Sequence, residues 1–240
     1  MNLDLPPLTT EQMKEVDRLM VEEYHIQLIQ MMENAGRHLA ALGRERFLGD
    51  DPEGRDVLVL AGSGGNGGGG MAAARRLHAW GAEVRVFLTR QPQSYEGVLV
   101  DQLKALQKLS DVPVKPASEV EQFEKADLIL DALIGYSLQG PPYGQAARMI
   151  GLANVHQAPI LSLDVPSGLD AGSGRSYRPH IQADATLTLA MPKQGLLTES
   201  ARTSVGDLYL ADIGVPPELY RHLGVSVGPI FSHSEILKIF

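Results

Sequence analysis

Short apolar runs that alternate with helical patterns are the feature that most limits how this chain can fold. Residues 57–61 read Val-Leu-Val-Leu-Ala, without the polar alternation of a half-exposed strand. Such a run is typical of a strand buried on both faces, as in a parallel sheet. Further strand patterns follow at 83–88, 128–130, 160–163, 185–190 and 208–211. Helical patterns lie between the earlier ones, at 71–80, 95–109 and 144–156. The alternation predicts an α/β fold with a mostly parallel, doubly wound sheet and right-handed crossovers.

A helical segment is expected ahead of this sheet. Between about residues 10 and 47, apolar side chains recur every three or four positions, which predicts two helices with a short break. The turn cluster Asp-Asp-Pro-Glu-Gly at 50–54 then precedes the first strand. The chain has no internal repeat and no low-complexity linker. We therefore expect residues 1–240 to form one domain, with a core at about 55–215 and a C-terminal tail.

Composition excludes several classes of protein. The chain has no cysteine, which rules out disulfides and thiolate chemistry and fits a reducing compartment. Its net charge of -8 argues against a general nucleic-acid-binding protein, which would carry a basic face. The first seven residues have neither a basic nor an apolar region, and no apolar run is long enough to cross a bilayer. A cytoplasmic protein without nucleic-acid or membrane partners is expected.

A glycine tract follows the first strand. Seven of the nine residues at 62–70 are glycine, and Gly62-x-Gly64-x-x-Gly67 matches the dinucleotide-binding fingerprint. Such glycines let the backbone approach a diphosphate, and the next helix offers free N–H groups to the anion. A flexible strand–helix turn is the alternative interpretation. The end of the second strand carries Arg90 in place of the acidic residue that a dehydrogenase uses to hold the ribose, which disfavours an NADP-linked oxidoreductase.

Two later strands end on carboxylates, Asp131 and Asp164. Either aspartate alone could be a helix cap or a turn former. In an open parallel sheet, however, ligands bind beyond the carboxyl ends of the strands, where the strand order reverses. Three strand ends carrying glycine, aspartate and aspartate predict one convergent site.

The chain resembles the NAD(P)H-hydrate epimerases, the YjeF N-terminal domain family, from about residue 13 to residue 214. The resemblance rests on motifs in the family's order, at 32–36 (Met-Glu-Asn-Ala-Gly), 62–70, 131–135 (Asp-Ala-Leu-Ile-Gly), 164–170 (Asp-Val-Pro-Ser-Gly-Leu-Asp), 183–186 (Ala-Asp-x-Thr) and 192–195 (Pro-Lys-x-Gly). It implies a Rossmann-like three-layer sandwich with N-terminal helices. It also implies a homodimeric isomerase that interconverts the R and S forms of the hydrates NADHX and NADPHX. An ATP- or ADP-dependent NAD(P)H-hydrate dehydratase would be a separate partner.

The resemblance also implies a set of site residues. Asp164 would contact the hydrate and act as its acid–base group. A potassium ion would be held by Asn66, Asp131 and Ser167, whose oxygen ligands suit a hard cation. The residues expected to bind the hydrate, besides Asp164, are Gly65, Asn66, Gly67, Gly68, Gly69, Gly135, Tyr136, Ser137, Leu138, Gln139, Gly140 and Pro141. Lys193 could steady the carboxylate or a phosphate, or could be a solvated surface lysine.

The glycine tract departs from the family pattern. Where the family usually has Gly-Asn-Asn-Gly-Gly-Asp-Gly, this chain reads Gly-Gly-Asn-Gly-Gly-Gly-Gly at 64–70, so that Gly65 and Gly69 replace an asparagine and an aspartate. Asn66 is retained. The loss of two polar side chains favours an alternative function, that of a non-catalytic nucleotide-binding or scaffold domain with the same fold.

Overall fold

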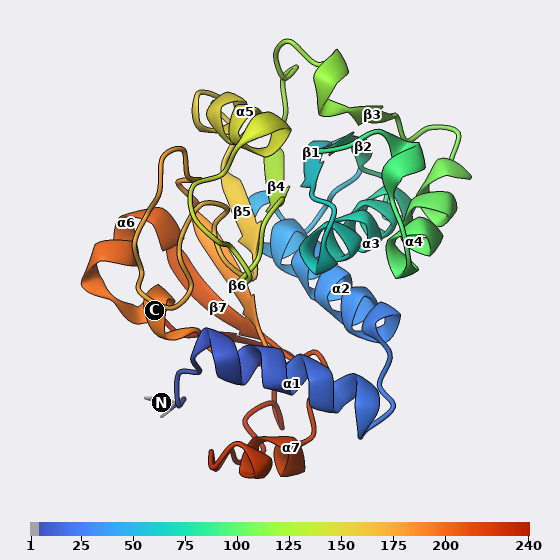
Figure 1. Cartoon of the computed structure of the whole chain (residues 1–240). Helices are drawn as coiled ribbons and strands as arrows, with labels where there is room; N and C mark the ends of the chain where they lie inside the picture. The colour runs from blue at the N-terminus through green and yellow to red at the C-terminus, as the bar shows by residue number, and fades with distance from the viewer. Residues whose placement is uncertain (1–4) are drawn as a thin grey trace.

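One eight-stranded sheet forms the centre of the computed structural model, which describes residues 5–240 (Figure 1). Residues 1–4, within the segment where no signal peptide is expected, lie outside the described residues. The strands are β1 (Asp56–Ala61), β2 (Glu83–Leu88), β3 (Val114–Pro116), β4 (Leu128–Ala132), β5 (Ile160–Leu163), β6 (Ala185–Leu189), β7 (Asp207–Ala211) and β8 (Ile236–Lys238). Their order is β3-β2-β1-β4-β5-β6-β7-β8, and β8 pairs antiparallel with β7 while the other pairs are parallel. The expected mostly parallel α/β fold is confirmed.

Helices cover both faces of this sheet. They are α1 (Thr10–Glu22), α2 (Leu28–Phe47), α3 (Gly65–Ala79), α4 (Val98–Gln107), α5 (Gly144–Asn154), α6 (Arg202–Val205) and α7 (Pro217–His222). Figure 1 shows α2, α3 and α4 on one side of the sheet and α5 on the other. Alternate residues of β1 divide accordingly, since Val57 and Val59 join the core with α2–α4, and Leu58 and Leu60 join the core with α5. Each such fully buried side chain stabilises the fold by about 1.5–3 kcal/mol, which explains the apolar runs.

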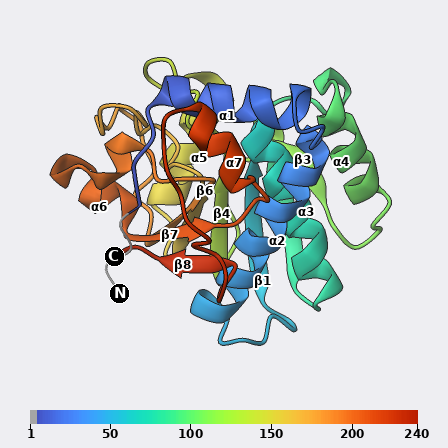
Figure 2. The same cartoon turned by 90° about the horizontal axis from the view of Figure 1, so that it is seen from below.

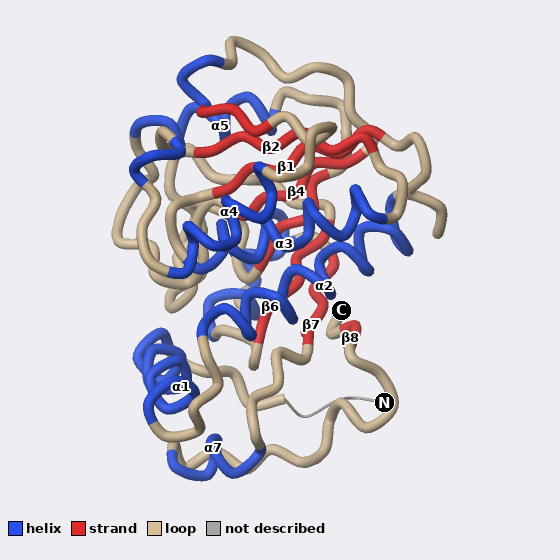
Figure 3. The backbone as a smooth tube through the Cα atoms, turned by 90° about the vertical axis from the view of Figure 1, so that its right-hand side faces the viewer, coloured by secondary structure: helices blue, strands red, loops and turns tan. Residues whose placement is uncertain are grey.

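The strand order reverses at β1. The chain runs from β1 outward to β2 and β3, then returns to place β4 on the other side of β1. The carboxyl ends of β1 and β4 therefore diverge into crossovers on opposite sides of the sheet, which opens a crevice there. Helix α1 lies beside α7, apart from the helices of the two main layers (Figure 3).

Helix α3 begins six residues earlier than the predicted start at residue 71, because the glycine tract is helical from Gly65. Glycine is a poor helix former, which is why the sequence reads as a loop. Here the missing side chains let α3 pack closely against α2 and β4. Figure 2 shows α2 and α3 side by side. A Cβ atom on Gly70 would lie 2.6 Å from Cβ of Ala132, and one on Gly36 of α2 would lie 2.5 Å from Cβ of Ala72.

Strands β3 and β8 and helices α6 and α7 were not predicted from the sequence. Strands β3 and β8 are three residues long and lie at the two edges of the sheet, where little burial is needed to hold them. Helix α7 is a short helix that starts at a proline. Within residues 5–240, no helix combines the length and apolar character needed to cross a bilayer.

Candidate active site

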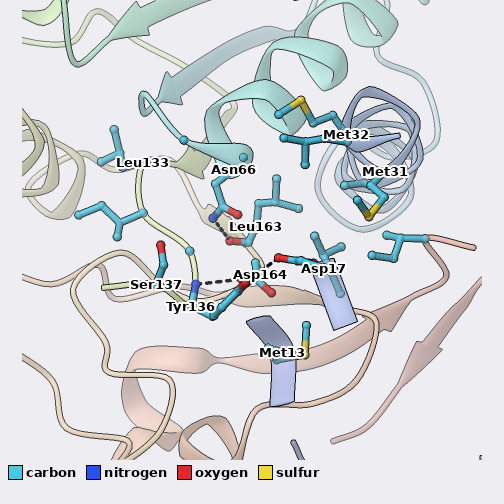
Figure 4. Close-up of a pocket in the computed structure, with 18 of the residues that line it drawn as sticks. Met13, Asp17, Met31, Met32, Asn66, Leu133, Tyr136, Ser137, Leu163 and Asp164 are labelled. Atoms are coloured by element: carbon cyan, nitrogen blue, oxygen red, sulfur yellow. Dashed lines mark hydrogen bonds between the residues drawn. The ribbon is translucent and has the colours of Figure 1, made fainter. Parts of the chain in front are cut away.

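A cavity of about 470 Å³ lies at the reversal of strand order (Figure 4). Its walls come from the first turn of α3, the segments after β4 and β5, and the sides of α1 and α2. Of the residues expected to bind a ligand, those that line it are Gly65, Asn66, Gly135, Tyr136, Ser137 and Asp164. Residues that follow β1, β4 and β5 therefore line one cavity, and their binding of a ligand stays a prediction.

Asp164 stands at the centre of this site. Its backbone φ is +67°, in the left-handed region, which costs a non-glycine residue about 1 kcal/mol or more. The side chain is only 3% exposed. One carboxylate oxygen accepts a hydrogen bond from the backbone N–H of Tyr136 at 3.0 Å, and the other pairs with Nζ of Lys193. A strained backbone that its surroundings hold in place is typical of functional sites.

Lys193 is fully buried, so its interpretation as a solvated lysine is wrong. Besides the ion pair with Asp164, its Nζ donates to Oγ1 of Thr188 at 3.1 Å and to the carbonyl oxygen of Leu189 at 2.8 Å. A buried ammonium needs both a counter-charge and hydrogen-bond acceptors. The lysine thus fixes the carboxylate of Asp164 from the side away from solvent.

Asp131 lies directly beneath the cavity and does not line it. Its carboxylate is fully buried and accepts hydrogen bonds from Oγ and N of Ser167 at 2.6 and 2.9 Å, Oγ of Ser162 at 2.8 Å, and N of Leu133 at 3.3 Å. Burial raises the pKa of Asp131, and the hydrogen bonds from Ser167, Ser162 and Leu133 oppose that rise. The carboxylate holds the segments after β4 and β5 together.

Of the three residues expected to hold a cation, Asp131 and Ser167 are hydrogen-bonded to each other, whereas the side chain of Asn66 is hydrogen-bonded to Leu163. Nδ2 of Asn66 donates to the carbonyl of Leu163 at 2.8 Å, which leaves its Oδ1 free to turn toward Gly135. A Cβ atom on Gly135 would lie 2.7 Å from that Oδ1 and 3.0 Å from Oδ2 of Asp164. Glycine at 135 therefore leaves a small space on which two oxygens converge. The donors are all oxygens, as a hard cation requires.

Other expected ligand contacts lie outside the cavity walls. Gly67, Gly68 and Gly69 are buried in the first turns of α3. Gly67 faces the backbone of Gly62, whereas Gly68 and Gly69 face α2 and β5, with Cδ2 of Leu163 at 2.7 Å from the position of a Cβ on Gly69. The second segment expected to bind the hydrate, 135–141, leaves the cavity after Ser137. Its last four residues do not line the cavity: Leu138, Gln139, Gly140 and Pro141. A glycine at 69 thus removes no contact with the cavity.

Sequence reasoning missed the contribution of the N-terminal helices. Met13 and Asp17 reach the cavity from α1, and Met31 and Met32 reach it from α2 (Figure 4). Asp17 accepts a hydrogen bond from the hydroxyl of Tyr136 at 2.5 Å. The signal was the spacing of Met13 and Asp17, which lie one helical turn apart on the same face.

Comparisons with known proteins identify the family of this chain. Residues 28–195 match the family described as YjeF-related protein N-terminus. The chain is 45% identical to an NAD(P)H-hydrate epimerase of Dehalogenimonas lykanthroporepellens, over 92% of this chain and 87% of that protein. It is 34% identical to an NAD(P)H-hydrate epimerase of Rhodopirellula baltica, over 93% of this chain and 90% of that one.

Two further relatives extend the comparison. A bifunctional NAD(P)H-hydrate repair enzyme of Moorella thermoacetica is 36% identical over 88% of this chain, which spans 41% of that protein. The crystal structure of the yeast protein YNL200c superposes with a TM-score of 0.79 at 27% identity, covering 98% of this chain and all of that one. The resemblance seen in the sequence motifs is confirmed, and the chain belongs to the family of the YjeF-related protein N-terminus.

Proposed function

We propose that this chain is an isomerase that interconverts the R and S forms of NAD(P)H hydrate, with Asp164 as an acid–base group. The isomerase assignment follows from epimerase relatives at up to 45% identity that match most of the chain. The observation that supports the role of Asp164 is its position, since it is a buried carboxylate that lines the cavity and is held by Lys193 and the backbone of Tyr136.

The chemistry needs a carboxyl group at this place. The hydrate carries a hydroxyl on the carbon beside the ring nitrogen, and the nitrogen lone pair can expel that hydroxyl as water. The water must gain a proton on leaving and lose one on its return to the opposite face. A placed carboxyl group accelerates such proton transfers by about 10²–10⁴-fold, or roughly 3–5 kcal/mol.

The rival interpretation, a scaffold domain without activity, loses part of its support. It rests on the glycines at 65 and 69, and Gly69 does not line the cavity. Asp164 and Asn66 line the cavity, and the buried Lys193 pairs with Asp164. The measurement that separates the two functions is the rate of R/S interconversion by the purified protein.

Glycine 65 and glycine 69 are expected to respond differently to restoration of the family's side chains. A Cβ on Gly65 meets nothing within 4 Å, and φ of neither glycine is in the left-handed region. Gly65→Asn should tighten hydrate binding about 2- to 10-fold, the value of one hydrogen bond. Gly69→Asp should lower the free energy of unfolding by about 1–3 kcal/mol, because it overpacks the contact with Leu163. Calorimetric titration measures hydrate binding by Gly65→Asn, and thermal unfolding measures the stability of Gly69→Asp. A Gly69→Asp protein as stable as the wild type would contradict the close packing of residue 69 against Leu163.

A potassium ion held by Asn66, Asp131 and Ser167 is the second part of the proposal. Burial raises the pKa of Asp131, whose hydrogen-bond donors are the neutral groups of Ser167, Ser162 and Leu133, and burying a carboxylate without a counter-charge is costly. When bound, the cation would supply that positive charge and tie the segments after β1, β4 and β5 together.

Replacing potassium with a large organic cation at equal ionic strength should therefore weaken hydrate binding about 5-fold or more. It should also lower the melting temperature of the protein without hydrate, since a ligand of the native state stabilises that state. Ser167→Ala should lose both responses. Equal affinities and equal melting temperatures in the two salts would contradict a bound potassium ion.

We also propose that the chain acts as a homodimer in the cytoplasm, beside an ATP- or ADP-dependent NAD(P)H-hydrate dehydratase. The family resemblance supports the dimer, and the cysteine-free sequence fits a reducing compartment. The bifunctional repair enzyme of Moorella thermoacetica, of which this chain spans 41%, supports a second activity that acts together with the epimerase.

A further inference from the structure

A second carboxyl group, that of Asp17 on α1, faces the cavity that holds Asp164 (Figure 4). Met13 lines the same cavity from one helical turn before it, so this face of α1 points into the site. The two carboxyl groups come from different parts of the chain, one from an N-terminal helix and one from the end of β5. Nothing in the role given to Asp164 uses the second one.

Tyr136 connects the two groups. Its hydroxyl donates to Oδ2 of Asp17 at 2.5 Å, and its backbone N–H donates to Oδ2 of Asp164 at 3.0 Å. Each carboxyl group is thereby positioned relative to one residue that itself lines the cavity. Asp17 and Asp164 form a pair with a fixed arrangement around the space where a ligand fits.

Their environments differ in charge. Burial raises the pKa of Asp17, and the nearby carboxylate of Asp164 raises it further, while the hydroxyl of Tyr136 and the ammonium of Lys193 act in the opposite direction. Asp17 therefore keeps its proton to a higher pH than an ordinary aspartate. Asp164, in contrast, forms a buried ion pair with Lys193. Two carboxyl groups in such different environments can divide the roles of acid and base.

Epimerisation by loss and return of water creates a need for two such groups. The hydroxyl leaves from one face of the nicotinamide ring, and the water adds to the other face. Lys193 and Tyr136 hold the carboxylate of Asp164 in one position, so that it can serve only one face of the ring. Asp17, which lines the same cavity from α1 and not from the end of β5, is available to serve the other face.

We propose that Asp17 is a second catalytic carboxyl group, which donates a proton to the departing hydroxyl while Asp164 accepts one from the returning water. The inference rests on the proposed epimerase function. In the first step the carbon–oxygen bond breaks, the oxygen leaves as water with the Asp17 proton, and the nitrogen lone pair forms a double bond to carbon. In the second, water forms a new bond to that carbon on the other face, the electron pair returns to nitrogen, and Asp164 takes the proton. Exchange with solvent returns a proton to Asp17 and removes one from Asp164, and the reverse reaction exchanges their roles.

The test is the dependence of kcat on pH in Asp17→Asn, an isosteric change that keeps an oxygen to accept from Tyr136. We expect kcat to fall about 10²–10⁴-fold, with KM changing less than about threefold. Because the acid must carry its proton, wild-type kcat should fall as pH rises through the pKa of Asp17, and the variant should lack that fall. Glu11→Gln, the same chemical change at an exposed position of α1, is the matched control and should leave kcat unchanged.

Two further variants separate catalysis from positioning. Asp17→Ala keeps a good helix former in α1. It should regain part of its activity in formate buffer at low pH, since formic acid can occupy the vacated space and supply the proton. Tyr136→Phe removes the contact to Asp17 but not the carboxyl group, so it should retain the fall in kcat at high pH. Asp17 loses this role if Asp17→Asn keeps near-normal kcat, or if Tyr136→Phe reproduces its loss and its pH profile. An inactive wild-type protein would instead overturn the epimerase function itself, and Asp17 with it.

Discussion

Asp164→Asn is expected to lower kcat for epimerisation by about two to four orders of magnitude. The amide retains an oxygen that can accept the hydrogen bond from the backbone of Tyr136, so the cavity should keep its shape. It cannot take a proton from the returning water, which is the step assigned to the carboxylate. Quenched time courses, with the two hydrate forms separated by chromatography, measure the effect.

The control for this variant is Asp101→Asn, the same change at an exposed position of α4. It should leave kcat within experimental error of the wild type. Circular dichroism and thermal unfolding establish that Asp164→Asn is folded. A folded Asp164→Asn protein with near-normal turnover would remove Asp164 from the reaction.

Lys193→Met is expected to have the largest effect on stability. The substitution leaves Asp164, 3% exposed, without its counter-charge, and breaking a buried ion pair from one side costs about 3–5 kcal/mol. For a chain of this size the melting temperature should fall by roughly 10 °C. Activity should fall as well, because the ammonium also orients the carboxylate.

A double variant tests the physical cause of that loss. In Lys193→Met combined with Asp164→Asn, no charge is left unpaired, so the double variant should be more stable than Lys193→Met alone. Denaturant unfolding of the wild type, both single variants and the double variant gives the coupling energy. Additive losses from the two substitutions would contradict the ion pair as the source of the instability.

Much of the fold and the centre of the site could be predicted from the sequence because they depend on local patterns. Strands β2 and β5 begin and end where the predicted runs do, since buried strands in a parallel sheet need continuous apolar residues. Asn66, Gly135 and Asp164 converge because the carboxyl ends of neighbouring parallel strands lie at one edge of the sheet.

The remainder of the site depends on tertiary packing that no local pattern encodes. Glycines 67–70 read as a loop, yet they are helical. Their missing side chains leave room in which α2 and β4 pack against α3. The sequence left Lys193 either as a partner of the carboxylate or as a solvated lysine, and the return of the chain after β6 buries it against Asp164. Asp17 lies some 150 positions before Asp164, and its role follows from how α1 is placed across the cavity.

Epimerisation of the hydrate of a reduced nicotinamide dinucleotide in this cavity is tested most directly from a single hydrate form, R or S. The appearance of the other form is followed with purified protein, in parallel with Asp164→Asn and with buffer alone. We expect rapid interconversion by the wild type and a rate near that of buffer for the variant. Binding of the hydrate by the wild type with no acceleration over buffer would contradict this expectation, and would identify the chain as a binding domain that retains the family's fold.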